Sequence, residues 1–373
     1  MRPVRILQVV TVMNRGGLET MIMNYYRQMD RAKIQFDFMV HRAGQGHYDD
    51  EILALGGKIH RMPQIRPGAY RSYFKQLDIF FAEHPEYGLV HAHINENSSF
   101  VLRAARKAGV PCRIAHSHLS DLGFDKKLPF RLYARYAMKD HPNSYFACSR
   151  KAGEWLFGRR IHGQSPLIVM HNAVPVQEFS FQPAVRHQIR DELNAEGRLV
   201  IGHIGRFNMQ KNHEFLIDVF QAVHHRNPDA LLVLAGEGQL KSAMQRKAEK
   251  LGLSQHIRFL GVRTDISRLL QGMDLFLFPS RFEGLPVVLI EAQAAGLKCV
   301  VSDAITREAD VTGRLQYASL QESPEAWARY ILESTYEHED TAEALRKQGY
   351  DTGVMAKWLG EYYINRLAAA DAR

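Results

Sequence analysis

The sequence lacks several features that identify particular classes of protein. It has no apolar run approaching about 18 residues, so no membrane-spanning helix is predicted. Its three cysteines, Cys112, Cys148 and Cys299, have neither CxxC nor zinc-ligand spacing, which favours a reducing cytoplasm. The apolar run at residues 4–10 is too short for a signal-peptide core. The absence of P-loop and GxGxxG motifs argues against ATP hydrolysis and NAD chemistry.

The length and the charge of the chain set the next limits. With 373 residues it exceeds the usual size of a single core, so two domains are expected. Its formal net charge of +8 favours anionic partners such as nucleotide sugars, lipid phosphates or an anionic membrane surface. No nucleic-acid-binding signature is present, so nucleic acid is not predicted as a partner.

Short apolar runs alternate with amphipathic stretches of helical length, which is typical of parallel α/β units. Strands are predicted at residues 4–10, 36–40, 89–93, 112–118 and 145–148, and again at 199–204, 231–235, 257–260, 275–279 and 298–302. The pattern predicts two Rossmann-like parallel-sheet domains that face each other across a cleft. We expect residues 1–180 to form the acceptor-binding domain and 181–353 the nucleotide-sugar-binding domain. A C-terminal helix, residues 354–373, is expected to cross back to the first domain.

The strongest motif lies at residues 282–287, which read Phe-Glu-Gly-Leu-Pro-Val, with a second carboxylate at Glu291. It follows a predicted strand and begins a helix, whose free N–H groups form an anion site. Glu291 stands in an apolar run, where a carboxylate is costly unless it receives a polar group such as a ribose diol. The alternative is that Glu283 caps the helix and that Glu291 faces solvent.

Two further motifs also follow predicted strands. Arg206, after a glycine, and the nearby Lys211 could neutralise a departing diphosphate without a metal ion, or could be solvated surface cations. The pair Gly16-Gly17 allows close approach of a bulky ligand, although an ordinary tight turn explains it equally well.

Four histidines occupy the ends of two predicted strands. His91 and His93 alternate on one strand, and His116 and His118 alternate on the other, so each pair shares a face. One interpretation is a zinc site, although no carboxylate or cysteine has matching spacing. We expect instead that one imidazole binds a sugar hydroxyl and that the others are satisfied by backbone groups.

Together these motifs resemble the retaining glycosyltransferases of family 4, which have the GT-B fold. The resemblance spans nearly the whole chain and is most specific in the Glu-x7-Glu pattern of Glu283 and Glu291. The Gly-Gly-Leu-Glu-Thr opening and the Ile-Ala-His-Ser-His segment resemble the subset that builds bacterial exopolysaccharide or capsule. At residues 172–175 the chain reads Asn-Ala-Val-Pro, whereas the family often has Asn-Gly, so the usual turn is not expected there.

The resemblance implies a metal-independent hexosyltransferase without a cofactor, with a nucleotide diphosphate sugar as donor and UDP as the expected nucleotide. The acceptor would be a glycan or a lipid-linked sugar. The implied catalytic residues are Glu283, His118, Arg206 and Lys211. The implied substrate-binding residues are Gly16, Gly17, His116, Val262, Arg263, Gly284, Leu285, Val287 and Glu291. His118 would contact the transferred sugar, with His116 as the alternative.

Other functions stay open at this point. A sugar-nucleotide epimerase has the same fold, as does a glycogen-type phosphorylase, although no pyridoxal phosphate lysine is evident. A nucleotide-binding or RNA-binding protein without transfer activity is the alternative outside enzymes. Residues 126–139 mix cations, including Lys126, Lys127 and Lys139, with aromatic side chains. This segment predicts peripheral contact with the inner face of the cell membrane, or else a solvated basic helix.

Overall fold

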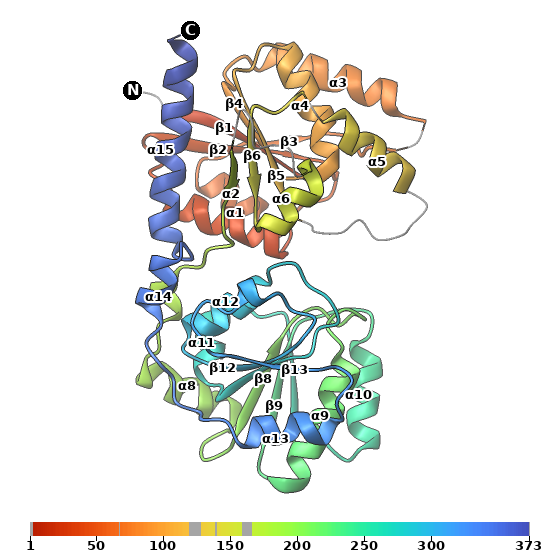
Figure 1. The fold of residues 1–373 in the computed structure, drawn as a ribbon, viewed down its shortest axis with the longest axis vertical. Helices are drawn as coiled ribbons and strands as arrows, with labels where there is room; N and C mark the ends of the chain where they lie inside the picture. Colours follow the sequence, from red (N-terminus) through yellow and green to blue (C-terminus); the bar gives the residue numbers. More distant parts are fainter. Residues whose placement is uncertain (1–2, 67, 119–127, 139, 159–165, 373) are drawn as a thin grey trace. The chain divides into compact units, whose positions relative to one another are not determined.

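The computed structural model describes residues 3–66, 68–118, 128–138, 140–158 and 166–372. The chain forms two compact units (Figure 1). The first unit comprises Met1–Ala173 with Thr352–Arg373, and the second comprises Val174–Asp351. Each unit contains one all-parallel sheet with helices on both faces, which is the fold class that the sequence predicts.

The first unit has a seven-stranded sheet in the order β3-β2-β1-β4-β5-β6-β7. Its strands are β1 Val4–Val10, β2 Ile34–Val40, β3 Ile59–Arg61, β4 Leu89–Ala92, β5 Cys112–Ser117, β6 Ser144–Ala147 and β7 Leu167–Val169. Its helices are α1 Gly17–Gln28, α2 Asp49–Ala54, α3 Tyr70–Glu83, α4 Ser98–Lys107, α5 Leu128–Ala137, α6 Arg150–Phe157 and α15 Thr352–Asp371.

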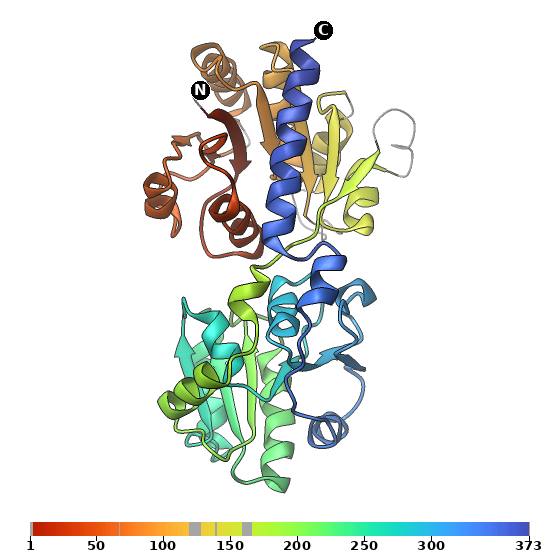
Figure 2. The same cartoon turned by 90° about the vertical axis from the view of Figure 1, so that its left-hand side faces the viewer.

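Side-chain alternation along β1 places this sheet between two helical layers. Ile6 and Val10 pack with residues of α1 and α15, whereas Leu7 and Val9 pack with residues of α3 and α4. Helix α15 thus contributes to the core of the first unit although it is last in the sequence. Figure 2 shows it running along the sheet of this unit.

The second unit has a six-stranded sheet in the order β10-β9-β8-β11-β12-β13. Its strands are β8 Val200–Ile204, β9 Leu231–Ala235, β10 Ile257–Gly261, β11 Leu275–Phe278, β12 Lys298–Ser302 and β13 Leu315–Ala318. Its helices are α7 Val176–Phe179, α8 Pro183–Leu193, α9 His213–Arg226, α10 Lys241–Lys250, α11 Ile266–Gln271, α12 Val287–Ala294, α13 Pro324–Leu332 and α14 Ala342–Lys347.

The second unit begins at Val174, seven residues before the predicted start of the second domain at residue 181. The difference has a packing cause. Val174, Val176 and Phe179 are buried in the core of the second unit, together with residues of α8, α11 and α12. These three apolar side chains stand in a mainly polar stretch of the sequence and form no apolar run. The sequence pattern alone therefore places the domain boundary after them.

In each sheet the strand order reverses once, and this reversal determines where a ligand can bind. The reversal lies between β1 and β4 in the first unit and between β8 and β11 in the second. Connections leave such neighbouring strands toward opposite faces, which opens a crevice beyond their carboxyl ends. The predicted glycine, histidine and glutamate motifs all follow these strands or their neighbours.

A buried carboxylate connects helix α8 to two strands of the second sheet. Asp274 accepts hydrogen bonds from Arg186, from Arg190 at 3.1 Å and from the backbone N–H of Val200 at 2.7 Å. Asp274→Ala would leave the buried Arg190 guanidinium without its carboxylate partner. We expect the free energy of unfolding of the second unit to fall by about 3–5 kcal/mol, measured by urea denaturation.

The control for this substitution is Glu343→Ala, which removes an exposed carboxylate paired with Lys347. Surface pairs of this kind contribute about 0–1 kcal/mol. A loss of stability in Asp274→Ala no larger than that of the control would contradict the role assigned to Asp274.

Candidate functional site

The two loops at the reversal of the second sheet are joined by an ion pair. Lys211, in the loop after β8, lies 2.6 Å from the Glu283 carboxylate, in the loop after β11. Gln210 donates a hydrogen bond to the other oxygen of Glu283 at 3.0 Å. The side chains of Lys211 and Glu283 are only 14% and 10% exposed, so the pair is stronger than a surface ion pair. The structure therefore brings together two of the predicted catalytic residues.

Further contacts fix these two loops against each other. The backbone N–H of Arg281 donates to the carbonyl oxygen of Gln210 at 2.8 Å, and the Asn212 side chain donates to that of Pro279 at 3.2 Å. The Lys211 ammonium also lies 4.5 Å from the centroid of the Phe278 ring, within the range of a cation–π contact. The positions of Lys211 and Glu283 are thus set before any ligand binds.

Glycines allow the backbone turns beside this pair to approach closely. A Cβ atom on Gly205 would lie 3.2 Å from the Lys211 side chain. A Cβ atom on Gly236, whose φ is +142°, would collide with the carbonyl oxygen of Gly205. The turns after β8 and β9 therefore pack backbone against backbone, which only glycine permits.

Arg206 differs from Lys211 in its surroundings. Its side chain is exposed, and within the described part of the chain it has no hydrogen bond or ion pair. A guanidinium in this state carries five free donors in a planar fork, the geometry that suits phosphate oxygens. The structure thus places one free cation and one paired cation after the same strand.

Glu291 lies in the second turn of α12 and is partly buried. Burial raises the pKa of its carboxyl group to about 7. Among the described residues none donates a hydrogen bond to it or forms an ion pair with it. A carboxylate in that environment is destabilising unless a ligand supplies donors, so Glu291 fits the binding role expected of it better than a solvent-facing one.

Helix α12 begins at Val287, with Pro286 as its N-cap, so Gly284 and Leu285 lie just before its first turn. Gly284 is exposed, whereas Leu285 and Val287 are buried in the core of the unit. Their side chains therefore anchor the loop, and any ligand contact would come from their backbone groups. The N–H groups at this helix start remain suited to an anion.

The predicted base-binding residues follow β10. Val262 is exposed, whereas Arg263 forms a bidentate pair with Asp265 at 2.8 and 2.7 Å. The hydrogen bond from Arg263 lowers the pKa of Asp265. Arg263 is therefore held beside its own loop, and Val262 is the residue that faces outward there.

Sequence reasoning assigned no role to three residues of this region. Gln210 supports Glu283, and its amide has no pattern that separates it from a solvent-facing glutamine. Met209 and Phe282 are large apolar side chains that are 58% and 63% exposed in the loops after β8 and β11. Exposed apolar side chains next to a charged pair are typical of a ligand-binding surface.

In the first unit, the Gly-Gly turn starts helix α1. Gly16 is the N-cap and Gly17 is the first helical residue. A Cβ atom on Gly16 would meet only the carboxylate end of the Glu19 side chain, which is flexible and can move away, so this contact does not by itself require a glycine. The structure places the turn at the carboxyl end of β1, next to the reversal of the first sheet.

The four histidines lie together in the core of the first unit. His91 contacts His116 through a hydrogen bond of 3.1 Å, and His93 contacts His118 at 3.0 Å. Their outer partners are the Tyr363 hydroxyl, 2.7 Å from His91, and the Gln8 side chain, 2.9 Å from His93. The expectation that most of these imidazoles are satisfied by backbone groups is therefore wrong, because they bind one another and two polar side chains.

Burial keeps this group of imidazoles neutral. It lowers the pKa of His118 to about 3, and those of His91, His93 and His116 well below the ordinary value. Because so weak a base is a poor proton acceptor at neutral pH, His118 does not suit the role of general base.

The contacts of these imidazoles do not suit a zinc site. Nitrogens of His91, His93 and His116 lie within 4.8 Å of one another. However, hydrogen bonds use both nitrogens of His91 and both of His93. The rings of His91 and His116 are also stacked, with an interplanar angle of 13°. Lone pairs in nearly parallel ring planes do not converge on one point, as a tetrahedral metal requires.

The predicted membrane segment is described only in part, as helix α5, while Lys126, Lys127 and Lys139 lie outside the described residues. Two of its arginines turn inward: Arg131 lies 3.7 Å from Glu96, and Arg135 donates to a backbone carbonyl of α6 at 3.2 Å. Its exposed apolar residues are Leu132, Tyr133 and Tyr136. None of the helices within the described ranges is long and apolar enough to cross a membrane.

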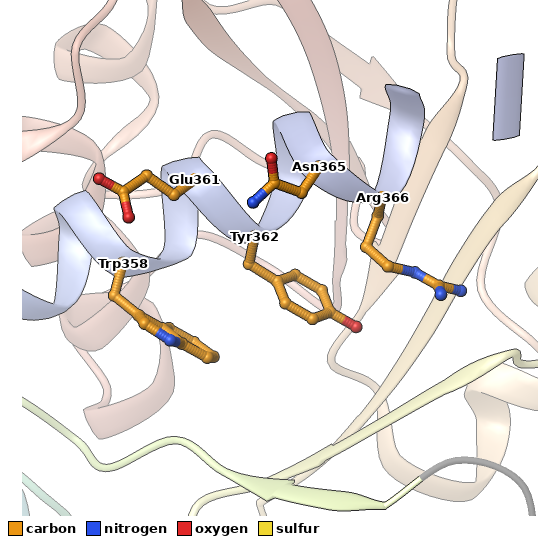
Figure 3. Close-up of a pocket in the computed structure, with 5 residues that line it drawn as sticks. All are labelled: Trp358, Glu361, Tyr362, Asn365 and Arg366. Atoms are coloured by element: carbon orange, nitrogen blue, oxygen red, sulfur yellow. The ribbon is translucent and has the colours of Figure 1, made fainter. Parts of the chain in front are cut away.

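A cavity of about 330 Å³ lies along helix α15 and contains none of the predicted site residues (Figure 3). It is lined by Trp358, Glu361, Tyr362, Asn365 and Arg366. Trp358 and Tyr362 stack with ring centroids 5.7 Å apart, and Tyr362 donates to Ser144 at 3.0 Å. The hydrogen bond to Ser144 fixes the helix to strand β6, and we assign the cavity no role in binding.

Residues 15–178 match the family profile described as Glycosyltransferase Family 4, and residues 185–352 match Glycosyl transferases group 1. The crystal structure of HepE from Anabaena in complex with UDP superposes with a TM-score of 0.77 at 18% identity, covering 97% of this chain and 100% of that one. The fold is thus that of the GT-B glycosyltransferases.

The relatives in sequence establish the family. The putative glycosyltransferase EpsF of Bacillus subtilis is 37% identical over 360 residues, which cover 93% of each chain. An Escherichia coli enzyme named UDP-Gal:alpha-D-GlcNAc-diphosphoundecaprenol alpha-1,3-galactosyltransferase is 27% identical over 58% of each chain. The chain belongs to the glycosyltransferases of family 4 and group 1.

The pKa of Glu291 predicts a pH dependence of stability. Because the folded-state value of about 7 exceeds the ordinary 4.5, stabilisation from the protonated form is complete below pH 4.5 and is lost as the pH rises through 7. Glu291→Gln cannot ionise, so at pH 8 it should exceed the wild type in stability by up to about 3 kcal/mol. Urea denaturation between pH 5 and pH 8, without ligand, measures the difference.

The control is Glu343→Gln, which removes an exposed carboxylate from the same unit. Its stability should follow that of the wild type across the pH range. Equal stabilities of Glu291→Gln and the wild type at pH 8 would contradict an ionised Glu291 without a partner.

Proposed function

We propose that this glycosyltransferase moves a hexose or N-acetylhexosamine from a UDP-sugar to a glycan or lipid-linked acceptor, with retention of anomeric configuration. The proposed process is surface polysaccharide synthesis in the cytoplasm, with contact to the inner face of the cell membrane through α5. The name of the Escherichia coli relative supports the proposed donor and acceptor, since it specifies a UDP-sugar donor and a lipid diphosphate acceptor. HepE, which was solved with UDP, has the same fold.

The observation that carries the proposal is the arrangement after β8 and β11. One strand end holds the exposed Arg206 and the paired Lys211, while the other holds Glu283 and the start of α12. We propose that Arg206 and Lys211 bind the diphosphate, that Glu283 holds hydroxyls of the sugar and that Glu291 takes the ribose. Val262 and Arg263 would border the base, and the backbone of Gly284, Leu285 and Val287 would complete the anion site.

In the first unit, we propose that Gly16 and Gly17 approach the diphosphate and that His118 accepts a hydrogen bond from the transferred sugar, with His116 behind it. The neutral state of these imidazoles supports this, because a neutral ring accepts from a hydroxyl.

The proposed reaction is a front-face displacement. The acceptor hydroxyl attacks the anomeric carbon from the side on which the diphosphate leaves, and a departing phosphate oxygen takes the hydroxyl proton. The C–O bond to the diphosphate breaks as the new glycosidic bond forms. Arg206, Lys211 and the start of α12 would stabilise the leaving charge, so neither a divalent metal nor a covalent nucleophile is assigned.

The ion pair makes a specific prediction for Glu283→Gln. Turnover should fall by about 100- to 1,000-fold, or roughly 2.7–4 kcal/mol, if Glu283 acts mainly in the transition state. Affinity for UDP should not weaken, since Lys211 loses a competing carboxylate and gains freedom to bind phosphate. Glu192→Gln, which breaks an exposed pair with Arg268, is the control. Steady-state kinetics and UDP calorimetry test this, and unchanged turnover would refute the assignment of Glu283.

The function itself is tested by a donor screen followed by analysis of the product. UDP-, GDP- and ADP-sugars are supplied with a short-chain lipid diphosphate N-acetylglucosamine in EDTA, and nucleotide release is recorded. An α-linked UDP-hexose should give an α-linked product in the first proton NMR spectrum. A β-anomeric coupling would overturn the mechanism, and activity that returns only with magnesium or manganese would overturn metal independence. Stoichiometric UDP binding without transfer would favour a binding protein instead.

A further inference from the structure

The four imidazoles, Gln8 and Tyr363 form one unbranched chain of hydrogen bonds. From one end it runs His118, His93, Gln8, Tyr363, His91 and His116, with successive distances of 3.0, 2.9, 3.4, 2.7 and 3.1 Å. The residues come from strands β1, β4 and β5, from the residues that directly follow β4 and β5, and from helix α15, all in the first unit. Every member except His118 is almost completely buried.

The chemistry of these groups gives the chain a direction. A neutral imidazole has one N–H donor and one bare acceptor nitrogen, a phenol has one hydrogen, and an amide has a distinct donor end and acceptor end. If one member reverses, each neighbour must reverse as well. The chain therefore has only two fully hydrogen-bonded states, and the orientation of the Gln8 amide distinguishes them.

In the structure the Gln8 amide has the orientation of one of these states. Its nitrogen donates to the Tyr363 hydroxyl, so the single Tyr363 hydrogen goes to Nδ1 of His91. His91 then donates from Nε2 to Nδ1 of His116. Nε2 of His116 has no partner among the described residues whichever way the chain runs, so that end does not select the direction.

On its other side, the Gln8 oxygen can only accept, so Nε2 of His93 carries a proton. Nδ1 of His93 is then bare and accepts from Nε2 of His118. A neutral His118 that donates from Nε2 has a bare Nδ1. The backbone N–H of His118 is held separately by the Asn95 side chain at 2.9 Å.

We propose that Gln8, Tyr363 and His93 are positioning residues that hold His118 in the tautomer with a bare Nδ1. This nitrogen can accept a hydrogen from a hydroxyl but cannot donate one to a carboxylate. The hydrogen-bond chain thus makes Nδ1 of His118 selective for a neutral, hydroxyl-bearing sugar over a uronic acid. The inference about the sugar rests on the proposed function, whereas the tautomer does not.

Helix α15 provides a matched pair of variants for the test. Tyr363→Phe removes the hydroxyl that joins His91 to Gln8, which frees the amide to turn over. Tyr362→Phe removes the neighbouring hydroxyl, which donates to Ser144 and is not part of the chain. Long-range ¹H–¹⁵N NMR of the full chain labelled in histidine reports which nitrogen carries the proton, and His118→Asn identifies the His118 signals.

We expect Nδ1 of His118 to be bare in the wild type and in Tyr362→Phe, and the two tautomers to be mixed in Tyr363→Phe. If Tyr363→Phe fails to fold, Gln8→Leu breaks the chain at its central member and should give the same mixture. A protonated Nδ1 in the wild type, or identical spectra for the two tyrosine variants, would overturn the proposal.

Binding supplies a second readout. UDP-glucose should bind the wild type more tightly than UDP-glucuronic acid, and Tyr363→Phe should narrow this ratio by roughly two- to tenfold, the contribution of one hydrogen bond. The affinity for UDP should be the same in the wild type and in both tyrosine variants. In Tyr362→Phe the ratio of UDP-glucose to UDP-glucuronic acid affinity should also equal that of the wild type. An unchanged ratio in Tyr363→Phe would overturn the selectivity. Failure of the proposed function would appear instead as a wild type that transfers no sugar while its histidine spectra stay as expected.

Discussion

In a parallel sheet the carboxyl ends of all strands lie at the same edge, and this constraint positions the candidate site residues of both units. In an all-parallel sheet, the loops that follow the strands gather along that edge, and a reversal of strand order separates two of them. Residues distant in sequence then become neighbours, as Lys211 and Glu283 do after β8 and β11. In the first unit, the ends of β1, β4 and β5 likewise bring Gln8 to the histidines.

The carboxyl-end edges of the two sheets differ in charge. The second unit presents charges: a free guanidinium, an ammonium–carboxylate pair and a partly buried carboxylate. The first unit presents a neutral network, since burial suppresses the charged form of every imidazole in it. Charges suit a diphosphate, and neutral acceptors suit hydroxyls. The two strand-end edges therefore differ in the chemical groups that they suit.

Much of the fold could be predicted from the sequence, because apolar runs and turn residues are local signals. The pattern missed three strands at sheet edges, β3, β7 and β13. β3 and β7 have only three residues, too few for a period to show, and β13 is only partly buried, which weakens its apolar signal. The sequence offers candidate site residues where a motif joins a strand end to a helix start, as at Glu283. It does not predict the residues that contact these candidates, since Gln210 has no distinctive pattern and Tyr363 is 272 residues from its partner His91. Such contacts depend on tertiary packing, which local sequence does not encode.

The arrangement around Glu291 shows why part of the site is costly to the empty protein. A carboxylate with a pKa raised to about 7 is destabilising in its ionised form, and its neighbours in α12 are apolar core residues. Lys211 and Glu283 avoid this cost by pairing, but Glu291 has no such partner within the described residues. A ligand that donates two hydrogen bonds to the Glu291 carboxylate would replace the water that burial removes. Part of the ligand's binding free energy would therefore offset the cost of the buried charge. The presence of a carboxylate in this apolar helix is thus better explained by binding than by folding.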